Sequence, residues 1–405
     1  MRTLWFVGGG GEAAPAIALA RSLGHRVVVS DRDPRAPGMR LAHHRAVAST
    51  YDPEETVAAA RDFERRHGRI DGVLSVAHDV PVTVAAVAEA LGLPGIPAET
   101  ARLATHKLDM KQRLARDGIP VPWFAPARRP EDVEAALREL GPPLIVKPVD
   151  SRGARGVVRL TGRVDPKWAF EAARSESPSG CVLVERFLDG PQISTESILV
   201  DGRAATPGFA DRNYARLEQF APFVIEDGGD LPSALPPGLR KRVREVVEAA
   251  ALSLGIRTGI AKGDVVVHRG EPTVIELAAR PSGGYFCTHE IPLSTGVEPV
   301  RAAIALALGE RPDPRAFEPR FERPVCQRYL LPEPGRVLRV AGAEQVRRAA
   351  GIAYLEVRVG PGDVIPPVRS HPARAGVVIA TGSTRAEARA RAEGAVEAIE
   401  IVTGA

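Results

Sequence analysis

Two acidic residues in apolar surroundings are the first feature that could perform chemistry. Asp264 begins the run DVVV and Glu276 lies within the run TVIEL, with a short segment containing Gly270 between them. Two β-branched runs joined in this way predict a β-hairpin, and alternate side chains of a strand share one face. A carboxylate among apolar residues is costly unless it is paired or binds a cation, and hard oxygen ligands suit Mg²⁺. The stretch therefore predicts a metal site made of Asp264 and Glu276.

The segment after Glu276 carries groups that would complete such a site. Arg280 supplies a fixed positive charge, and the glycine pair that follows could offer free backbone N–H groups. Charge neutralisation is the main demand of phosphoryl transfer. We therefore expect phosphoryl-transfer chemistry here, with these candidate substrate-binding residues: Arg280, Ser282, Gly283 and Gly284.

A second glycine-rich segment follows the predicted strand 143–149. Lys147 lies near the end of that strand, and the loop DSRGARGV comes directly after it. A cationic loop rich in glycine can surround phosphates with its backbone N–H groups. It is not a P-loop, because GxxxxGK[ST] is absent. Lysine occurs only at positions 107, 111, 147, 167, 241 and 262, so a lysine beside this loop is informative.

Composition excludes several classes of protein. The 405 residues are too many for one small core. The formal charge is 54 − 50 = +4, without a basic block interleaved with aromatics, so no nucleic-acid partner is expected. Three cysteines without a CxxC pair argue against a disulfide framework or a zinc site and fit the cytoplasm. No apolar run approaches the length of a membrane span.

The elements that must position these residues can be outlined from periodicity. Residues 1–95 alternate strands and helices, which predicts a parallel sheet. Their GGGGE segment with Asp31 lacks the GxGxxG order, so a structural turn is favoured over a dinucleotide site. Residues 208–237 are expected to be a long, partly irregular surface stretch, and its segment 210–237 is a candidate lid. The tail, 325–405, is expected to hold strands and a terminal helix, 384–402, without a catalytic pairing of its own.

These motifs occur in an order that resembles the ATP-grasp carboxylate–amine ligases. The tail pattern IAYLEVRVGPGDVIPP…GVVIATGSTRAEA is similar to the C-terminal part of L-amino acid ligases. The resemblance implies an ATP-grasp fold, of the α/β and α+β class. It would divide the chain into a Rossmann-like N-terminal domain (1–100), an ATP-grasp domain (101–310, with lobes 101–180 and 181–310) and a C-terminal α+β domain (311–405).

The resemblance also assigns roles. ATP and Mg²⁺ are the implied cofactors, with Mn²⁺ as an alternative ion. Asp264 and Glu276 correspond to the metal ligands, and Lys147 and Arg280 to catalytic cations. The residues that would hold ATP contact its phosphates, its adenine or its ribose, and they are Lys107, Lys147, Ser151, Gly153, Gly156, Glu185, Phe187, Leu188 and Gln192.

The sequence departs from the family pattern in places. Ala278 stands where the family often has an amide ligand, which puts a second Mg²⁺ in question, and Lys262 stands where histidine is frequent. Some roles stay open: Asp79 could line a cleft or cap a helix, and Glu196 could be structural or bind substrate. His289 and Glu290 are expected to be structural.

The implied reaction joins a carboxylate, plausibly that of an amino acid, to an amine through an acyl phosphate, with release of ADP and phosphate. The alternative is an ATP-dependent carboxylase or formyl-phosphate-type enzyme of nucleotide or cofactor metabolism, and a third reading is a non-catalytic nucleotide-binding module. The segment PSGGYFCTHE after Arg280 favours the first. Small-molecule carboxylate and amine substrates and a homodimer are expected by analogy with the fold.

Overall fold

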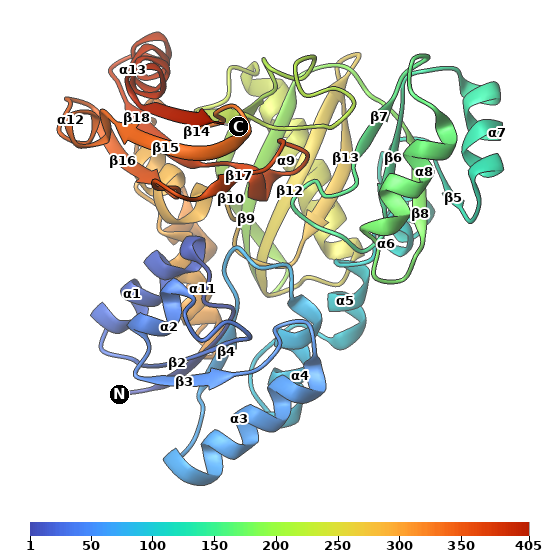
Figure 1. Cartoon of the computed structure of the whole chain (residues 1–405). Helices are drawn as coiled ribbons and strands as arrows, with labels where there is room; N and C mark the ends of the chain where they lie inside the picture. The colour runs from blue at the N-terminus through green and yellow to red at the C-terminus, as the bar shows by residue number, and fades with distance from the viewer. Residues whose placement is uncertain (405) are drawn as a thin grey trace.

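The N-terminal part of the chain forms a parallel sheet in the order β3-β2-β1-β4. The structure is a computed structural model that describes residues 1–404 (Figure 1). Asp31, at the end of β2, accepts a hydrogen bond from the Gly9 N–H over 2.8 Å, so the acid fixes the glycine-rich turn. The elements here are β1 (Thr3–Val7), α1 (Ala14–Ser22), β2 (Arg26–Asp31), α2 (Pro37–Leu41), β3 (His44–Val47), α3 (Pro53–His67), β4 (Gly72–Leu74) and α4 (Pro81–Leu91).

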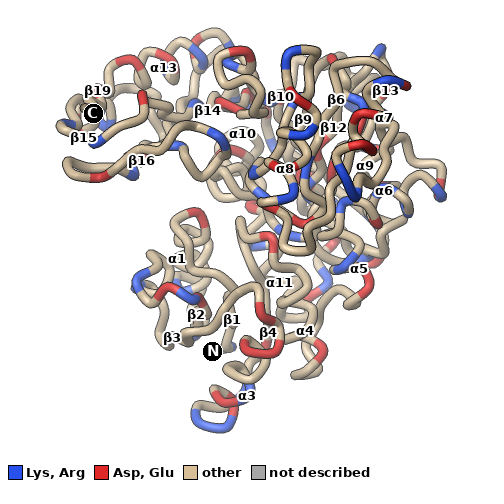
Figure 2. The backbone as a smooth tube through the Cα atoms, turned by 45° about the vertical axis from the view of Figure 1, so that its right-hand side comes forward, with Lys and Arg blue, Asp and Glu red and all other residues tan. Residues whose placement is uncertain are grey.

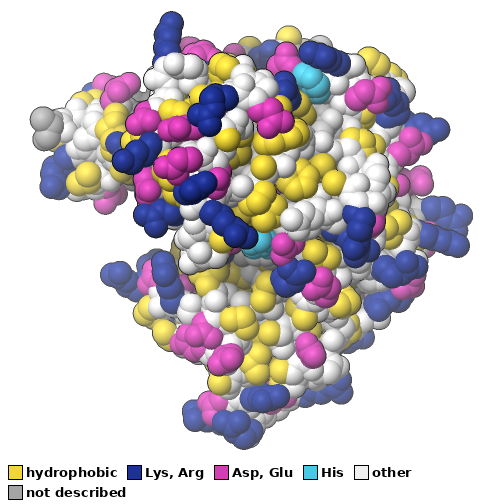
Figure 3. All heavy atoms as spheres, turned by 90° about the vertical axis from the view of Figure 1, so that its right-hand side faces the viewer, with side chains coloured by type: hydrophobic (Ala, Val, Ile, Leu, Met, Phe, Trp, Pro, Cys, Tyr) yellow, Lys and Arg dark blue, Asp and Glu magenta, His cyan; other side chains and the backbone are white. Residues whose placement is uncertain are grey.

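A second, antiparallel sheet has the order β5-β8-β6-β7 and carries helices α7 and α8 (Figure 1, right). β8 pairs with β5 and β6, so this lobe continues past residue 180 to Arg186. On this side of the molecule basic and acidic side chains are mixed (Figure 3). Its elements, with the two helices that precede them, are α5 (Ala98–Leu103), α6 (Lys107–Arg116), β5 (Phe124–Ala127), α7 (Pro130–Leu140), β6 (Leu144–Pro148), β7 (Val158–Leu160), α8 (Pro166–Ser175) and β8 (Val182–Arg186).

The largest sheet contains the predicted hairpin and has the order β13-β12-β9-β10-β11-β14-β18-β16. Arg269 and Gly270 join β12 to β13, and both have positive φ (51° and 81°). A two-residue connection of this kind is the turn that matches strand twist. α9 (Pro237–Ser253) packs on the hairpin side, where Val243 and Val247 join the core. The strands are β9 (Gln192–Val200), β10 (Arg203–Asn213), β11 (Gly228–Leu231), β12 (Gly259–His268) and β13 (Glu271–Ala278).

The prediction of a partly irregular surface stretch over residues 208–237 was wrong at its first residues and at 228–231, whereas residues 214–227 do lie outside helices and strands. β10 runs on to Asn213, and β11 is a buried strand that pairs with β10 and with β14. The sequence of β11, GGDL, has low intrinsic strand preference. Its strand conformation therefore depends on the two neighbours that enclose it, which local sequence does not reveal.

The tail contributes to the same large sheet. β14 (Val325–Leu330), β18 (Gly376–Thr381) and β16 (Ile352–Val357) extend it beyond β11. The predicted helix 384–402 ends early: α13 covers Arg385–Ala398, and Glu400–Gly404 form β19, which pairs with β15. The residues EIVTG include three β-branched side chains, which favour a strand. The remaining elements are α10 (Ile291–Thr295), α11 (Pro299–Ala307), β15 (Gly335–Ala341), α12 (Ala343–Arg347) and β17 (Val364–Ile365).

Helix α11 connects the parts of the molecule, because it packs against β4 of the N-terminal sheet and against β12 of the large sheet. Gly72 of β4 lies so close to this helix that a Cβ at that position would meet the Ala307 carbonyl oxygen at 2.7 Å. Among residues 1–404, no helix is both long enough and apolar enough to cross a membrane.

Candidate active site

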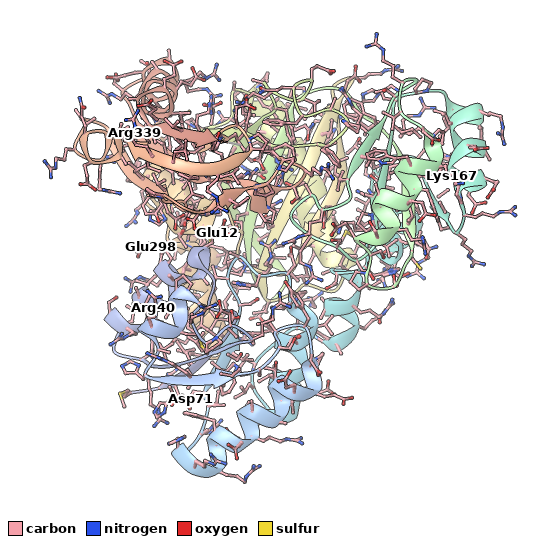
Figure 4. All side chains as sticks on the ribbon, in the orientation of Figure 1. Glu12, Arg40, Asp71, Lys167, Glu298 and Arg339 are labelled. Atoms are coloured by element: carbon pink, nitrogen blue, oxygen red, sulfur yellow. The ribbon has the colours of Figure 1, made fainter. Side chains whose placement is uncertain are left out.

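A cavity of about 910 Å³ lies where the N-terminal part, the four-stranded antiparallel sheet, the large sheet and the tail meet. Figure 4 shows Glu12, one of its lining residues, where the N-terminal part faces the tail. Every site residue predicted from the sequence lines this cavity except Gly156. Gly156 turns the loop instead: it has φ 66°, and a Cβ there would lie 3.2 Å from the Ala172 carbonyl oxygen. The sequence thus located residues that are far apart in the chain but share one space.

The two predicted metal ligands face each other across the hairpin. Asp264 and Glu276 are directly paired in register on β12 and β13. Asp264 is buried, and its Oδ1 accepts from Ser194 Oγ at 3.0 Å and lies 3.0 Å from Arg212 Nη1, while Lys262 Nζ contacts Oδ2. Burial alone would raise the pKa of the Asp264 carboxyl, but Arg212 and Lys262 hold it well below its ordinary value.

Glu276 connects the predicted metal site to the predicted phosphate loop through a lysine. Its Oε1 lies 3.1 Å from Lys107 Nζ, which also donates to the Ser151 carbonyl oxygen over 2.6 Å. Lys107 begins α6, so a helix terminus fixes the position of this ammonium group. One lysine therefore links a predicted metal ligand to the loop predicted to cover phosphates.

These residues fit a divalent ion that is shared with phosphate oxygens. Within residues 1–404, no group of three or more His, Cys, Asp or Glu side chains is arranged to hold a metal. Two carboxylates with substrate oxygens and water is a usual set for Mg²⁺. Ala278 pairs with Lys262 across the hairpin and offers no ligand there. Figure 2 shows basic and acidic positions close together along β9, β10 and β12.

A buried triad of charges lies beside the hairpin. Glu185 Oε1 is 2.9 Å from Lys147 Nζ and 3.1 Å from Lys111 Nζ, and all three side chains are buried. Burial lowers the pKa of Lys111 to about 8, against the opposing effect of Glu185. Glu185 was predicted to be among the residues that hold ATP, and its side chain pairs with both lysines. Sequence reasoning missed Lys111, although the scarcity of lysine in this chain was a signal for it.

Arg280 meets an acid from the N-terminal part. Its Nε donates to Asp79 Oδ1 over 2.6 Å, and Asp79 belongs to the loop after β4. Burial alone would raise the pKa of Asp79, but Arg280 lowers it to about 2. Asp79 therefore lines the cleft, and the alternative prediction was wrong, because α4 has Val80 at its start with no side-chain cap.

The glycine pair after Arg280 was expected to offer free backbone N–H groups, and one of them is already bonded. The Gly284 N–H is not free, because it donates to Glu12 Oε2 over 2.7 Å. Gly283 is close to the same carboxylate, since a Cβ there would lie 2.8 Å from Glu12 Oε2. The other oxygen of Glu12 lies 3.1 Å from Arg358 Nη2. The tail, predicted to lack catalytic pairings, thus reaches the cavity with charged side chains, including Glu356, Arg358 and Arg374.

The loop 151–156 contacts both sides of the cavity. Arg152 Nη1 donates to the Asp79 carbonyl oxygen over 3.1 Å, and its guanidinium lies 4.0 Å from the centre of the Tyr51 ring. From the tail, the His371 N–H donates to the Gly153 carbonyl oxygen over 2.9 Å. The loop is therefore held over the cavity by the N-terminal part and the tail together.

Three stretches of the chain match known families. Residues 17–95 match the ATP-grasp N-terminal domain, 104–284 the ATP-grasp domain, and 328–404 the L-amino acid ligase C-terminal domain 2. A curated relative, formate-dependent phosphoribosylglycinamide formyltransferase of Burkholderia thailandensis, is 28% identical over 98% of this chain and 94% of its own length. The protein of the same name from Rhodococcus jostii is 28% identical over 67% of this chain and 68% of its own length.

Solved structures share the fold. L-amino acid ligase of Bacillus licheniformis superposes with a TM-score of 0.85 at 23% identity, covering 100% of this chain and 99% of that one. An ADP complex of N5-carboxyaminoimidazole ribonucleotide synthetase gives 0.76 at 17% identity, with 97% and 96% covered. Fold and site together define an ATP-dependent ligase. The chain belongs to the ATP-grasp family, as the sequence motifs predicted, and ATP with Mg²⁺ is the cofactor pair of that family.

Proposed function

We propose that the protein is an ATP-dependent carboxylate–amine ligase that acts on an amino acid. One observation carries this proposal: the predicted phosphate and metal residues share a cavity with a second polar region made of Glu12, Glu356 and Arg358. A phosphate site alone would suit many nucleotide-binding proteins. A second region with both carboxylates and a guanidinium suits substrates that carry both charges, as amino acids do.

The proposed roles follow from position. Lys107, Lys147 and Arg280 neutralise charge as a substrate carboxylate attacks the terminal phosphate of ATP and ADP leaves. Mg²⁺, when bound at Asp264 and Glu276, adds charge neutralisation at the phosphates. The resulting acyl phosphate is attacked at its carbonyl carbon by an amine, which loses a proton as phosphate departs. The loop 151–156 would keep water from this intermediate.

A second candidate rests on sequence similarity. The formate-dependent relative aligns with 98% of the chain at 28% identity. In this alternative the carboxylate is formate and the amine belongs to a nucleotide precursor. Both candidates use the same phosphate chemistry and differ in the occupant of the second polar region.

Measuring ADP release with pairs of substrates tests the proposal. Amino acids supplied singly and in pairs should give turnover that depends on both a carboxylate and an amine. Turnover with formate or bicarbonate alone as the carboxylate would contradict the amino-acid proposal and favour the alternative. ADP release with no carboxylate dependence would contradict both.

We also propose the larger organisation. The chain would divide near residues 100 and 310, with the two ATP-grasp lobes meeting after Arg186 because β8 belongs to the first sheet. We propose a homodimer by analogy with the fold. A cytoplasmic location is supported by the three free cysteines and by the need for ATP.

A further inference from the structure

One buried carboxyl group in the cavity has no partner. Glu290 lines the cavity with only 3% of its surface exposed. Within residues 1–404, no hydrogen bond or ion pair reaches its side chain, and only burial and more distant charges act on it. A buried carboxylate is costly unless it is paired. Glu290 was expected to be structural, but it has no structural contact that explains a charged group in this place.

The backbone positions Glu290 through an unusual turn. Tyr285 adopts a left-handed conformation (φ 65°), and a single π-helical turn, Phe286–Glu290, follows it. The Glu290 N–H donates to the Tyr285 carbonyl oxygen over 3.2 Å. Single π-turns are often found at functional sites. Only Tyr285 separates this turn from Gly284, so the turn connects the glycine pair near Arg280 to the carboxyl group.

The wall opposite Glu290 is backbone rather than side chain. Gly229 of β11 lies there: a Cβ at that position would be 3.8 Å from Glu290 Oε2. Gly229 pairs with Gln327 of β14, whose Nε2 contacts the Gly284 carbonyl oxygen. All three residues line the cavity. The glycine leaves space in front of the carboxyl group, and the rigid sheet fixes the walls of that space.

The cation that acts on Glu290, Arg328, is itself paired, because its Nη2 lies 3.5 Å from Asp230 Oδ1 and 3.1 Å from Glu393 Oε1. Glu226 lies 2.9 Å from Arg212 Nη2, and Asp230 lies 3.1 Å from Arg389 Nη2. These acids are already paired. Burial raises the pKa of Glu290 well above its ordinary value, and the two acids add to this rise against the opposing effect of Arg328. A ligand with a positive charge would lower the free-energy cost of ionising the Glu290 carboxyl.

We propose that Glu290 binds a primary ammonium group of the substrate. An ammonium group offers three hydrogen-bond donors and a positive charge, and these are the partners that the desolvated Glu290 carboxylate lacks. The inference rests on the proposed function for the identity of the cavity, and it assigns the substrate a positive charge at this end. An amino acid bound in this way has its ammonium group at the π-turn and its carboxylate toward Arg280.

Binding measurements test the subsite independently of turnover. Each of the twenty amino acids is titrated by calorimetry into the protein in the presence of Mg²⁺ and ADP. The affinity of each is compared with that of its 2-hydroxy analogue, and the affinity of lysine is also compared with that of norleucine. The first comparison detects an α-ammonium and the second a side-chain ammonium. We expect at least one amino acid to bind, and its analogue without that ammonium to bind about tenfold or more weakly.

Substitution then locates the effect. Glu290→Gln keeps the shape without the charge and should weaken the amino acid about tenfold while leaving the analogue unchanged. Glu298→Gln, an exposed acid labelled in Figure 4, is the matched control and should bind as the unchanged protein does. Thermal unfolding checks that both variants are folded, and the comparison of analogues needs no variant at all.

The outcomes separate the two proposals. Amino acids that bind through Glu290 without any release of ADP would contradict the ligase function and leave the subsite standing. Turnover of amino acids with an unchanged KM in Glu290→Gln would contradict the subsite alone. Equal affinity for amino acids and their analogues, or no amino acid binding at all, would also overturn the subsite.

Discussion

Arg280 Nε donates to Asp79 Oδ1 over 2.6 Å, and this pair joins the end of β13 to the loop after β4. The guanidinium predicted to face the terminal phosphate is thus oriented by an acid from another part of the chain. Pro281 extends the same connection, because its carbonyl oxygen accepts from the Ala77 N–H at 3.2 Å. The N-terminal part therefore helps to form the predicted phosphate end of the cavity.

Asp79→Asn tests this relationship. The substitution removes the charged acceptor of Arg280, so we expect kcat to fall about tenfold while the affinity for ATP changes little, because misplacing a catalytic group affects the transition state more than binding. Steady-state kinetics and nucleotide titration measure the two effects. Asp62→Asn, at a partly exposed acid of α3 that pairs with Arg65 and Arg66, is the control. Equal losses of kcat and ATP affinity would indicate a simple binding role for the pair.

Glu276→Gln tests the metal site. The hairpin can form without the charge, but one of the two carboxylate ligands is lost, so Mn²⁺ binding in the presence of ADP should weaken about tenfold or more. Electron paramagnetic resonance of free Mn²⁺ gives the affinity directly. Glu271→Gln, an exposed acid on the same hairpin that pairs with Arg242, is the matched control. Unchanged Mn²⁺ affinity in Glu276→Gln would remove Glu276 from the proposed ligands.

Glu185→Gln tests the buried triad. The change leaves Lys111 and Lys147 in the interior with a neutral amide between them, and removing one partner of buried ion pairs typically costs about 3–5 kcal/mol. We expect the free energy of unfolding in urea to fall by about this amount. Glu171→Gln, in the exposed pair with Arg174 on α8, should change it by less than about 1 kcal/mol. A stable Glu185→Gln variant would show that one lysine is already neutral.

Glu196→Gln tests the pH dependence of stability. Burial raises the pKa of Glu196 from 4.5 to about 7, and one of its oxygens accepts from the Ser282 N–H at 2.9 Å. Between these two pH values the folded protein holds a proton that the unfolded chain releases, so this group makes stability fall as pH rises from 4.5 to 7. The loss amounts to about 3 kcal/mol at pH 7.

Glutamine keeps an acceptor for Ser282 and does not titrate. We therefore expect Glu196→Gln to flatten the decline in unfolding free energy between pH 5 and pH 7. At pH 7 the variant should be as stable as the unchanged protein or more so. Identical pH profiles of the two proteins would mean that Glu196 is ionised in the folded state.

Local sequence was sufficient for the hairpin. Asp264 and Glu276 interrupt β-branched runs around a Gly-containing turn, and every part of that pattern lies within twenty residues. The same holds for the loop after Lys147. Strand alternation and turn chemistry act over short distances, so they can be predicted without knowing the tertiary structure.

The partners of these residues could not be found in this way. Lys111 lies one helical turn after Lys107, as a polar residue of a short helix, and becomes a buried cation only because β8 brings Glu185 to it. Arg212 lies in a segment predicted to be irregular. Glu356 lies near the end of β16 and Arg358 directly follows that strand, but which cavity they face depends on how the strand joins the large sheet. Each omission concerns a long-range pairing.

Because β11 pairs with β14, truncated or domain-swapped variants of this chain depend on the tail to complete the large sheet. Gly228 to Leu231 are in register with Arg328 to Val325, so the tail completes a sheet that begins at the hairpin. A protein shortened before residue 325 would present β11 as an open edge, ready to pair with other chains and precipitate. A tail domain from another ligase would have to supply a strand that pairs with β11 in the same register. Exchanging the tail alone is therefore not expected to transfer substrate specificity.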